Sequence, residues 1–149
     1  MSNVSPHFSW EELTRTGQTA LQAANRTEAE QYRAQLTALA TTLLEAIRAK
    51  FGPIKINSAF RGPSVNAAVG GSKTSQHMRG EAADIVAPAV SVEELHRWIC
   101  AESGLAFGQC ILEKSAPDRP FTWVHVSLGT KREALVYNGA GKYTTWRPA

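Results

Sequence analysis

The strongest constraint on the fold is an apolar stripe in the N-terminal half of the chain. Large apolar side chains recur at spacings of three and four residues, at Tyr32, Leu36, Leu39, Leu43 and Ile47. Residues at these spacings share one face of an α-helix, so the pattern predicts one long amphipathic helix, which Gly52-Pro53 ends. This helix has to bury its stripe against a second layer. Its role is therefore packing, and the chemistry is expected elsewhere.

Capping boxes predict three helix starts. In this motif a Ser or Thr side chain accepts a hydrogen bond from the backbone N–H three residues on, where a Glu side chain reaches back. The motif occurs at Ser9 with Glu12, at Thr27 with Glu30, and at Ser91 with Glu94. In the third helix Leu95, Trp98 and Ile99 share the packed side. His96 is therefore expected to point toward solvent.

Short segments with strand character follow the long helix. They cover residues 54–58, 82–86, 107–113, 121–128 and 134–137. Because helices gather toward the N-terminal part and strands toward the rest, the pattern predicts an α+β fold with a mainly antiparallel sheet. Residues 61–80 are rich in Gly, Ser and Asn and show no apolar periodicity, so they are predicted to form a long loop. Loops of that length in a compact domain are usually functional.

Composition limits the classes of protein that this chain can belong to. A length of 149 residues with 43% hydrophobic content fits a single domain over residues 1–149. The net charge of +3 is spread along the chain, so we expect no nucleic-acid partner. We expect a soluble monomer, made in the cytoplasm without stable membrane insertion, because neither a membrane-spanning run nor a signal peptide is recognisable. Cys100 and Cys110 are expected to be reduced core residues.

Two segments contain candidate metal ligands, Ser75-Gln-His-Met-Arg-Gly-Glu-Ala-Ala-Asp84 and Trp123-Val-His-Val-Ser127. His77, Asp84 and His125 would give zinc three protein ligands and leave a fourth position for water, as in catalytic zinc sites. Gly80 would let the chain turn between the first two ligands. Two His and one carboxylate also form the facial triad of mononuclear iron oxygenases. In that triad the first two ligands usually lie only two residues apart, which argues against it here.

The same residues resemble a known family pattern. Ser-x-His-x-x-Gly-x-Ala-x-Asp followed by Trp-Val-His-Val-Ser is similar to the zinc D-alanyl-D-alanine carboxypeptidases and their phage peptidoglycan endopeptidase relatives, the Hedgehog-type LAS metallopeptidases. The resemblance includes His7-Phe-Ser-Trp-Glu-Glu-Leu13 and Ile56-Asn-Ser-Ala-Phe-Arg-Gly-Pro63, and extends to about residue 137. It implies a sheet carrying a Zn²⁺ site, a helical layer behind it, and hydrolysis of peptide bonds in peptidoglycan stem peptides. The expected setting is cell wall degradation after release, as by an endolysin or a tail-associated phage protein.

Peptide hydrolysis also needs a group that moves protons. In several relatives this base lies three residues before the last His, where the present chain has Thr122, which cannot serve. Glu113 is the best substitute, because it resembles the Glu that ends a strand in another branch of the family. Its alternative role is a surface carboxylate at a strand end. The departure at Thr122 also leaves open a non-catalytic zinc-containing module that binds cell wall or forms part of a phage particle.

The pairing of segments 107–113 and 121–127 decides which side chains accompany Glu113. Side chains alternate between the two faces of a strand. If Glu113 and His125 share a face, Gln109, Ile111 and Trp123 share it as well. The intervening residues then face the core: Cys110, Leu112, Val124 and Val126.

Four side chains are candidate substrate contacts: Arg61, Ser75, Gln109 and Trp123. A guanidinium suits a stem-peptide carboxylate or the oxyanion formed at the attacked carbonyl, and the resemblance gives the matching Arg this catalytic role. Its alternative is to anchor a loop. Ser75 would steady the substrate or orient a ligand, or make only a local turn hydrogen bond. Trp123 is expected to form a wall of the cleft.

Overall fold

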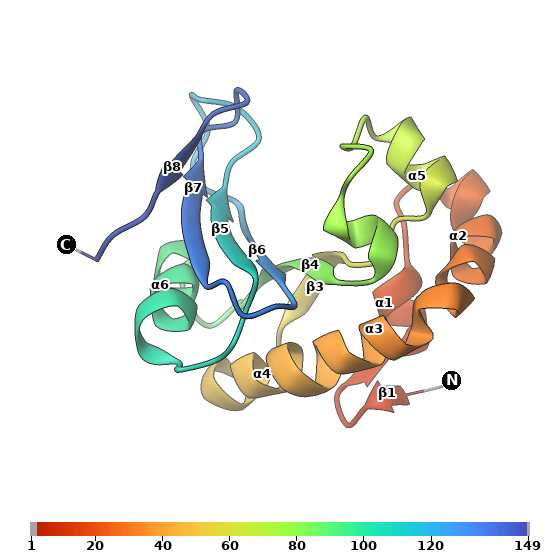
Figure 1. Ribbon diagram of the computed structural model, residues 1–149, viewed down its shortest axis with the longest axis horizontal. Helices are drawn as coiled ribbons and strands as arrows, with labels where there is room; N and C mark the ends of the chain where they lie inside the picture. Colours follow the sequence, from red (N-terminus) through yellow and green to blue (C-terminus); the bar gives the residue numbers. More distant parts are fainter. Residues whose placement is uncertain (1–2, 149) are drawn as a thin grey trace.

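The computed structural model describes residues 3–148 and consists of a twisted sheet backed by helices (Figure 1). The sheet has six strands in the order β3-β4-β6-β5-β7-β8. Their bounds are β3 (Lys55–Ser58), β4 (Ala82–Val86), β5 (Gln109–Glu113), β6 (Trp123–Ser127), β7 (Glu133–Tyr137) and β8 (Tyr143–Thr145). Neighbouring strands are antiparallel except for β5 and β7, which are parallel. The predicted α+β class with a mainly antiparallel sheet is confirmed.

Helices make up most of the N-terminal half. They are α1 (Trp10–Thr14), α2 (Gln22–Ala29), α3 (Arg33–Leu39), α4 (Glu45–Phe51), α5 (Pro63–Ala68) and α6 (Val92–Arg97). Short 3-10 turns are η1 (Thr19–Leu21), η2 (Glu30–Tyr32) and η4 (Gln76–Arg79), and π-helical turns are η3 (Ala40–Leu44) and η5 (Trp98–Glu102). A small hairpin of β1 (Asn3–Ser5) and β2 (Phe8–Ser9) precedes them. None of the described helices is long and apolar enough to cross a membrane.

The predicted long helix exists and buries the predicted stripe except for Tyr32, which lies just before it in η2 and is half-buried. Helices α3 and α4 continue into each other through η3, and the run ends at Gly52, whose φ of 81° lies in the left-handed region. Leu36, Leu39, Leu43 and Ile47 are fully buried. They pack into one core with the inward side chains of the sheet, namely Ala83, Ile85, Cys110, Leu112, Val124 and Val126. The helices therefore cover one face of the sheet and leave the other face for a site.

Two of the three predicted helix starts are confirmed. Ser9 accepts from the backbone N–H of Glu12, whose side chain accepts from the N–H of Ser9. Ser91 likewise accepts from the backbone N–H of Glu94. The predicted start at Thr27 is wrong, because α2 already begins at Gln22. The Thr27 hydroxyl donates instead to the carbonyl of Ala23 one turn back, so it is not free to cap a helix.

Two further expectations are corrected by the fold. Residues 61–80 are not one long loop, because α5 begins at Pro63, a residue suited to the first position of a helix, and η4 follows. His96 does not face solvent but is fully buried, since its Nε2 lies 3.1 Å from the carbonyl oxygen of Cys110 and finds a polar partner in the core. The two cysteines are free thiols, as expected, with Cys110 buried and Cys100 half-buried.

A buried asparagine joins the helices to the segment that carries Arg61. Asn25 Nδ2 donates to the carbonyl oxygens of Thr14 at 2.7 Å and of Phe60 at 3.2 Å. Its Oδ1 accepts from the backbone N–H of Gly62 at 2.7 Å. The two residues that flank Arg61 are thus held by one side chain. Among the hydrogen bonds of residues 3–148, Asn25 is the only partner of the Phe60 carbonyl and of the Gly62 N–H, whereas the Thr14 carbonyl also accepts from Gln22 Nε2 at 3.0 Å.

We expect Asn25→Ala to lower the free energy of unfolding by about 2–3 kcal/mol, because it leaves buried backbone groups without partners. Urea denaturation measures the change. Gln31→Ala, at an exposed position nearby, is the matched control and should shift stability by less than ~0.5 kcal/mol. Equal stability of the two variants would contradict the structural role of Asn25.

Candidate active site

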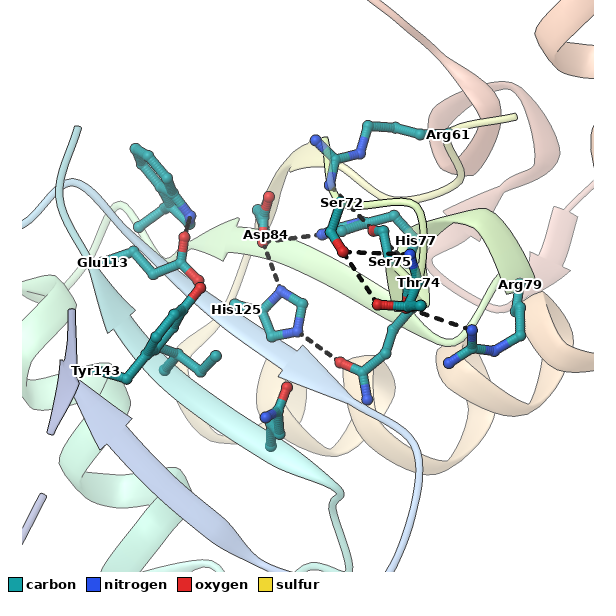
Figure 2. Close-up of a pocket in the computed structure, with 14 residues that line it drawn as sticks. Arg61, Ser72, Thr74, Ser75, His77, Arg79, Asp84, Glu113, His125 and Tyr143 are labelled. Atoms are coloured by element: carbon teal, nitrogen blue, oxygen red, sulfur yellow. Dashed lines mark hydrogen bonds and ion pairs between the residues drawn. The ribbon is translucent and has the colours of Figure 1, made fainter. Parts of the chain in front are cut away.

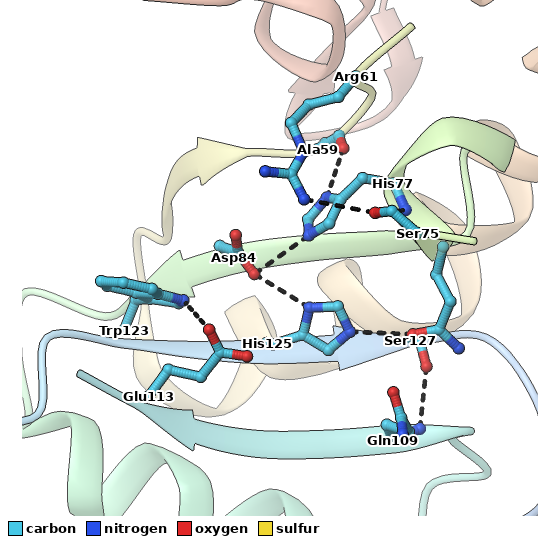
Figure 3. A network of polar contacts seen from close by, with 11 residues as sticks. Ala59, Arg61, Ser75, His77, Asp84, Gln109, Glu113, Trp123, His125 and Ser127 are labelled. Carbon is cyan, nitrogen blue, oxygen red and sulfur yellow. Dashed lines mark hydrogen bonds and ion pairs between the residues drawn. The ribbon is translucent and has the colours of Figure 1, made fainter. Parts of the chain in front are cut away.

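The three predicted metal ligands meet on the open face of the sheet. Asp84 lies directly opposite His125 in the antiparallel pairing of β4 with β6, and η4 brings His77 to the same point (Figure 3). Asp84 Oδ1 is 3.3 Å from His77 Nε2 and 3.1 Å from His125 Nδ1. One ligand atom from each residue lies within 4.8 Å of the other two. Segments far apart in the sequence therefore supply one compact donor set.

Hydrogen bonds fix which imidazole nitrogen faces this centre. His77 Nδ1 lies 2.7 Å from the carbonyl oxygen of Ala59, and His125 Nε2 lies 3.0 Å from Oε1 of Gln76. Both partners are acceptors, so these two nitrogens carry the protons. In neutral rings the lone pairs of the other two nitrogens then point at the Asp84 carboxylate. Acceptors that face one another need a cation or extra protons between them, so the donor set fits a metal ion.

The charge state of Asp84 agrees with this role. Burial by itself would raise the pKa of this carboxyl. When extra protons replace the cation between these groups, the charge of His77 and the hydrogen bonds from both imidazoles outweigh burial and hold the pKa of Asp84 well below its usual range. Asp84 is therefore an anionic oxygen donor at neutral pH.

Local backbone geometry delivers His77 to the site. Ser75 caps η4, since its Oγ accepts from the backbone N–H of His77 at 3.2 Å. Gly80 ends the turn with a φ of 69°, and a Cβ there would come within 2.9 Å of Leu36 Cγ. A side chain at this position would be both strained and crowded. The prediction that Gly80 allows the chain to turn between the two ligands is confirmed.

Glu113 ends β5 on the same face as His125, so the structure settles the register that the sequence left open. Ile111 lies opposite His125 and Glu113 opposite Trp123. Trp123 Nε1 donates to Glu113 Oε1 at 3.0 Å. Burial raises the pKa of Glu113 to about 7, and the Asp84 carboxylate adds to the increase. Glu113 is thus no ordinary surface carboxylate, although its assignment as the base stays a prediction.

Arg61 and Ser75 lie together on the opposite wall. Arg61 Nη2 donates to Ser75 Oγ over a long distance of 3.4 Å. Within residues 3–148, Arg61 Nε is buried and has no hydrogen-bond partner. Ser75 therefore makes the expected local turn bond and also contacts Arg61. Contact of either side chain with substrate stays a prediction.

All of these side chains line a cleft of about 560 Å³ (Figure 2). Gln109 also lines it and donates through Nε2 to Glu133 Oε1 at 3.0 Å. Five lining residues were not anticipated: Ser72, Thr74, Gln76, Arg79 and Tyr143. Of these, Gln76 carried a usable signal, because it directly precedes a predicted ligand and metal-bound imidazoles need an outer hydrogen-bond partner.

Comparison with known proteins agrees with this geometry. A family model described as Peptidase M15 matches residues 6–126, which is most of the chain. The chain belongs to the peptidase M15 family. Members of this family are metal-dependent peptidases. The three ligand atoms in the cleft agree with that description. No curated protein matches the chain.

One wall of the cleft in this M15 peptidase is formed by a residue beyond residues 6–126, the part that the family model matches. Tyr143 on β8 reaches the cleft from the sheet edge, with its ring centroid 4.7 Å from that of Tyr137. Figure 2 shows its hydroxyl pointing toward Glu113. Partial desolvation of this otherwise exposed residue, followed by the charge of Glu113, raises the pKa of Tyr143. The phenol therefore stays protonated at neutral pH and can donate a hydrogen bond in the cleft.

We expect His77→Ala, Asp84→Ala and His125→Ala each to remove about one equivalent of bound metal per chain, because three protein ligands are needed to hold the ion. Elemental analysis after dialysis measures the content. His7→Ala is the matched control, since His7 is exposed and pairs with Glu45 away from the cleft. Unchanged metal content in one of the three variants would exclude that residue as a ligand.

The raised pKa of Glu113 predicts a pH dependence of stability in the metal-free M15 peptidase. Between about pH 4.5 and 7 the folded state keeps a proton on Glu113 that the unfolded state has released. The contribution of Glu113 to stability therefore falls as pH rises through this window. Gln cannot ionise, so Glu113→Gln should gain stability relative to wild type, by up to about 3 kcal/mol between pH 5 and 8.

Urea denaturation in the presence of a chelator measures this difference at both pH values. Glu93→Gln, which removes an exposed carboxylate from α6, is the matched control for net charge. A Glu113→Gln curve that stays parallel to wild type across the window would show that the carboxyl is not desolvated.

Proposed function

We propose that this chain is a zinc peptidase that hydrolyses peptide bonds in the stem peptides of peptidoglycan. The observation that carries the proposal is the convergence of His77 Nε2, Asp84 Oδ1 and His125 Nδ1 beside the Glu113 carboxyl in one cleft. Two imidazole nitrogens and one carboxylate oxygen are typical of catalytic zinc sites. Membership of a peptidase family favours zinc over an oxygen-activating iron centre with the same donors.

A zinc ion held by these three residues would lower the pKa of a bound water to about 7 and polarise a carbonyl oxygen. The protein itself supplies the orientation of the ligands. Ala59 and Gln76 hold the two imidazoles in the tautomers that present lone pairs to the centre. Both supports are uncharged acceptors, so they orient the rings without adding charge.

Glu113 is the proposed proton carrier. A pKa of about 7 lets the carboxyl accept a proton from water and later return one to the leaving amine near neutral pH. The hydrogen bond from Trp123 Nε1 holds one carboxyl oxygen and so fixes the orientation of the group. Tyr143, whose hydroxyl points toward the same carboxyl in Figure 2, is placed to donate to it or to substrate.

Arg61 is the proposed anchor for an anionic group of the substrate. Its Nε is buried without a partner among residues 3–148, and Nη2 makes only the long contact to Ser75. A carboxylate or a developing oxyanion in the cleft would satisfy this donor. Arg79 adds a second guanidinium to the lining. Peptidoglycan stem peptides carry free carboxylates, and this chemistry suits a cationic wall.

The alternative is a module that binds cell wall without turnover. Its support is Thr122, an exposed residue whose hydroxyl donates to the Pro120 carbonyl and which offers no carboxylate. The carboxyl of Glu113 at the cleft offsets this loss and favours an active enzyme. We place the action of the enzyme at the cell wall, as for a phage or prophage lysis or tail-associated protein. Because one chain supplies every proposed site residue, we propose that it acts as a monomer.

We expect digestion of purified peptidoglycan to release new amine termini, to stop on chelation and to resume when zinc is added. Glu113→Gln should retain metal and lose activity by about a hundredfold or more, because general acid–base catalysis contributes at least that much. Glu93→Gln is the control and should remain active. Mass spectrometry of the products identifies the bond, whether D-Ala-D-Ala, L-Ala-D-Glu or a cross-link.

Three results would contradict the proposed function or mechanism. Cell wall that is bound without release of termini would favour the non-catalytic module. Full turnover by Glu113→Gln would remove Glu113 from the mechanism. Iron in the purified protein together with oxygen consumption would replace the peptidase by an oxygenase.

A further inference from the structure

A second cluster of possible ligands lies on the helix-facing side of the sheet, away from the cleft. His96 on α6, Cys100 on η5 and Cys110 on β5 each place one ligand atom within 4.8 Å of the other two. His96 Nε2 and Cys100 Sγ are 3.5 Å apart. His96 and Cys110 are fully buried, and Cys100 is half-buried. The peptidase chemistry uses none of these residues.

The secondary structure holds the cluster together from two sides. His96 and Cys100 are four residues apart and share one face of a helix, which passes through the π-helical turn η5 at Cys100. Such turns are rare and are frequent at functional sites. Cys110 is fixed by strand pairs on both sides, opposite Val126 of β6 and Ala134 of β7. The donors therefore sit on two rigid elements that pack against each other.

The buried imidazole is incompletely satisfied as it stands. His96 Nδ1 is buried and has no hydrogen-bond partner within residues 3–148. If Nε2 carries the proton and donates to the Cys110 carbonyl, the lone pair of Nδ1 is stranded. If Nδ1 carries the proton, the lone pair of Nε2 faces that carbonyl oxygen and the Cys100 sulfur. A cation on Nε2 would use this lone pair and remove the conflict with the carbonyl oxygen, while Nδ1 keeps its proton without a partner among residues 3–148.

A positively charged side chain lies next to the cluster. Arg132, in the left-handed region with a φ of 53°, donates to the carbonyls of Cys100 and Leu105 and packs over the ring of Phe107. Its positive charge thus lies beside the half-buried thiol. A thiolate is the form that binds a metal.

We propose that His96 Nε2, Cys100 Sγ and Cys110 Sγ form a second, structural site for a zinc ion. Zn–S bonds of about 2.3 Å and Zn–N bonds of about 2.0–2.1 Å place tetrahedral ligand atoms about 3.5–3.8 Å apart. The measured separation of His96 Nε2 and Cys100 Sγ, 3.5 Å, agrees with this. Two thiolates neutralise the dication in the core. Water or the Cys110 carbonyl oxygen, 3.1 Å from His96 Nε2, completes the coordination.

Such an ion would fasten α6 and η5 to β5. Cys110 lies between Gln109 and Ile111, whose side chains point the other way into the cleft. The same strand ends at Glu113. Metal in the core would therefore stiffen the strand that carries the proposed base, without touching substrate.

Cobalt substitution tests the proposal, because only sulfur ligands give thiolate-to-cobalt charge-transfer absorption in the near ultraviolet. Chelator-treated, freshly reduced protein is titrated with Co²⁺. Wild type should bind about two equivalents and develop the sulfur band. His125→Ala should bind about one equivalent and keep the band, because the cleft site has no sulfur donor. Cys100→Ser should bind about one equivalent and lose it.

Thiol reactivity gives a second readout. Zinc should slow modification of the thiols by a disulfide reagent by about tenfold or more in wild type and in His125→Ala, because a metal-bound thiolate is a poor nucleophile. One equivalent of cobalt without the sulfur band would overturn the proposal. So would thiols that react equally fast with and without zinc, or a Cys100–Cys110 disulfide that persists in freshly reduced protein.

Discussion

The pairing register of β4 with β6 is the constraint on which the site depends. Asp84 faces His125 across this pair, while the alternate residues of both strands are buried beneath the helices. A slip of one residue would turn the carboxylate into the apolar core and expose the core residues. Burial of the apolar face therefore fixes the register, and the register brings two ligands together. The same alignment of β4 with β6 buries the apolar side chains and brings the two ligands together.

The third ligand depends on a different kind of restraint. His77 comes from an irregular segment, which no strand register positions. The carbonyl of Ala59, the cap from Ser75 and the left-handed turn at Gly80 hold it instead. Asn25 on α2 holds Phe60 and Gly62, the residues on either side of Arg61, and so also positions Arg61. One side of the cleft is thus rigid through its sheet, and the other side through hydrogen bonds to backbone atoms.

Sequence reasoning was reliable where a repeated pattern existed. The apolar stripe from Leu36 to Ile47 and the alternation around His125 each involve several residues, so one unfavourable position could not hide them. It was wrong where the prediction depended on a single residue, as for the helix start at Thr27, whose hydroxyl bonds within the helix instead of capping it. It also placed His96 in solvent, because the sequence does not show that the Cys110 carbonyl lies close enough to be a partner for a buried ring. The short strand β8, with its exposed side chains, gave no pattern to detect.

The sequence by itself determined the layers and the metal-binding residue types, because periodicity and motif spacing are local properties of the chain. The strand face on which Glu113 lies depended on the register of β5 with β6, which only the folded structure gives. Tertiary structure alone decided the tautomers of the two imidazoles, the pKa of Glu113 near 7 and the entry of Tyr143 into the cleft. It alone also gathered His96, Cys100 and Cys110. Each of these depends on desolvation or on contacts between segments remote in sequence. Such quantities exist only after the chain has folded.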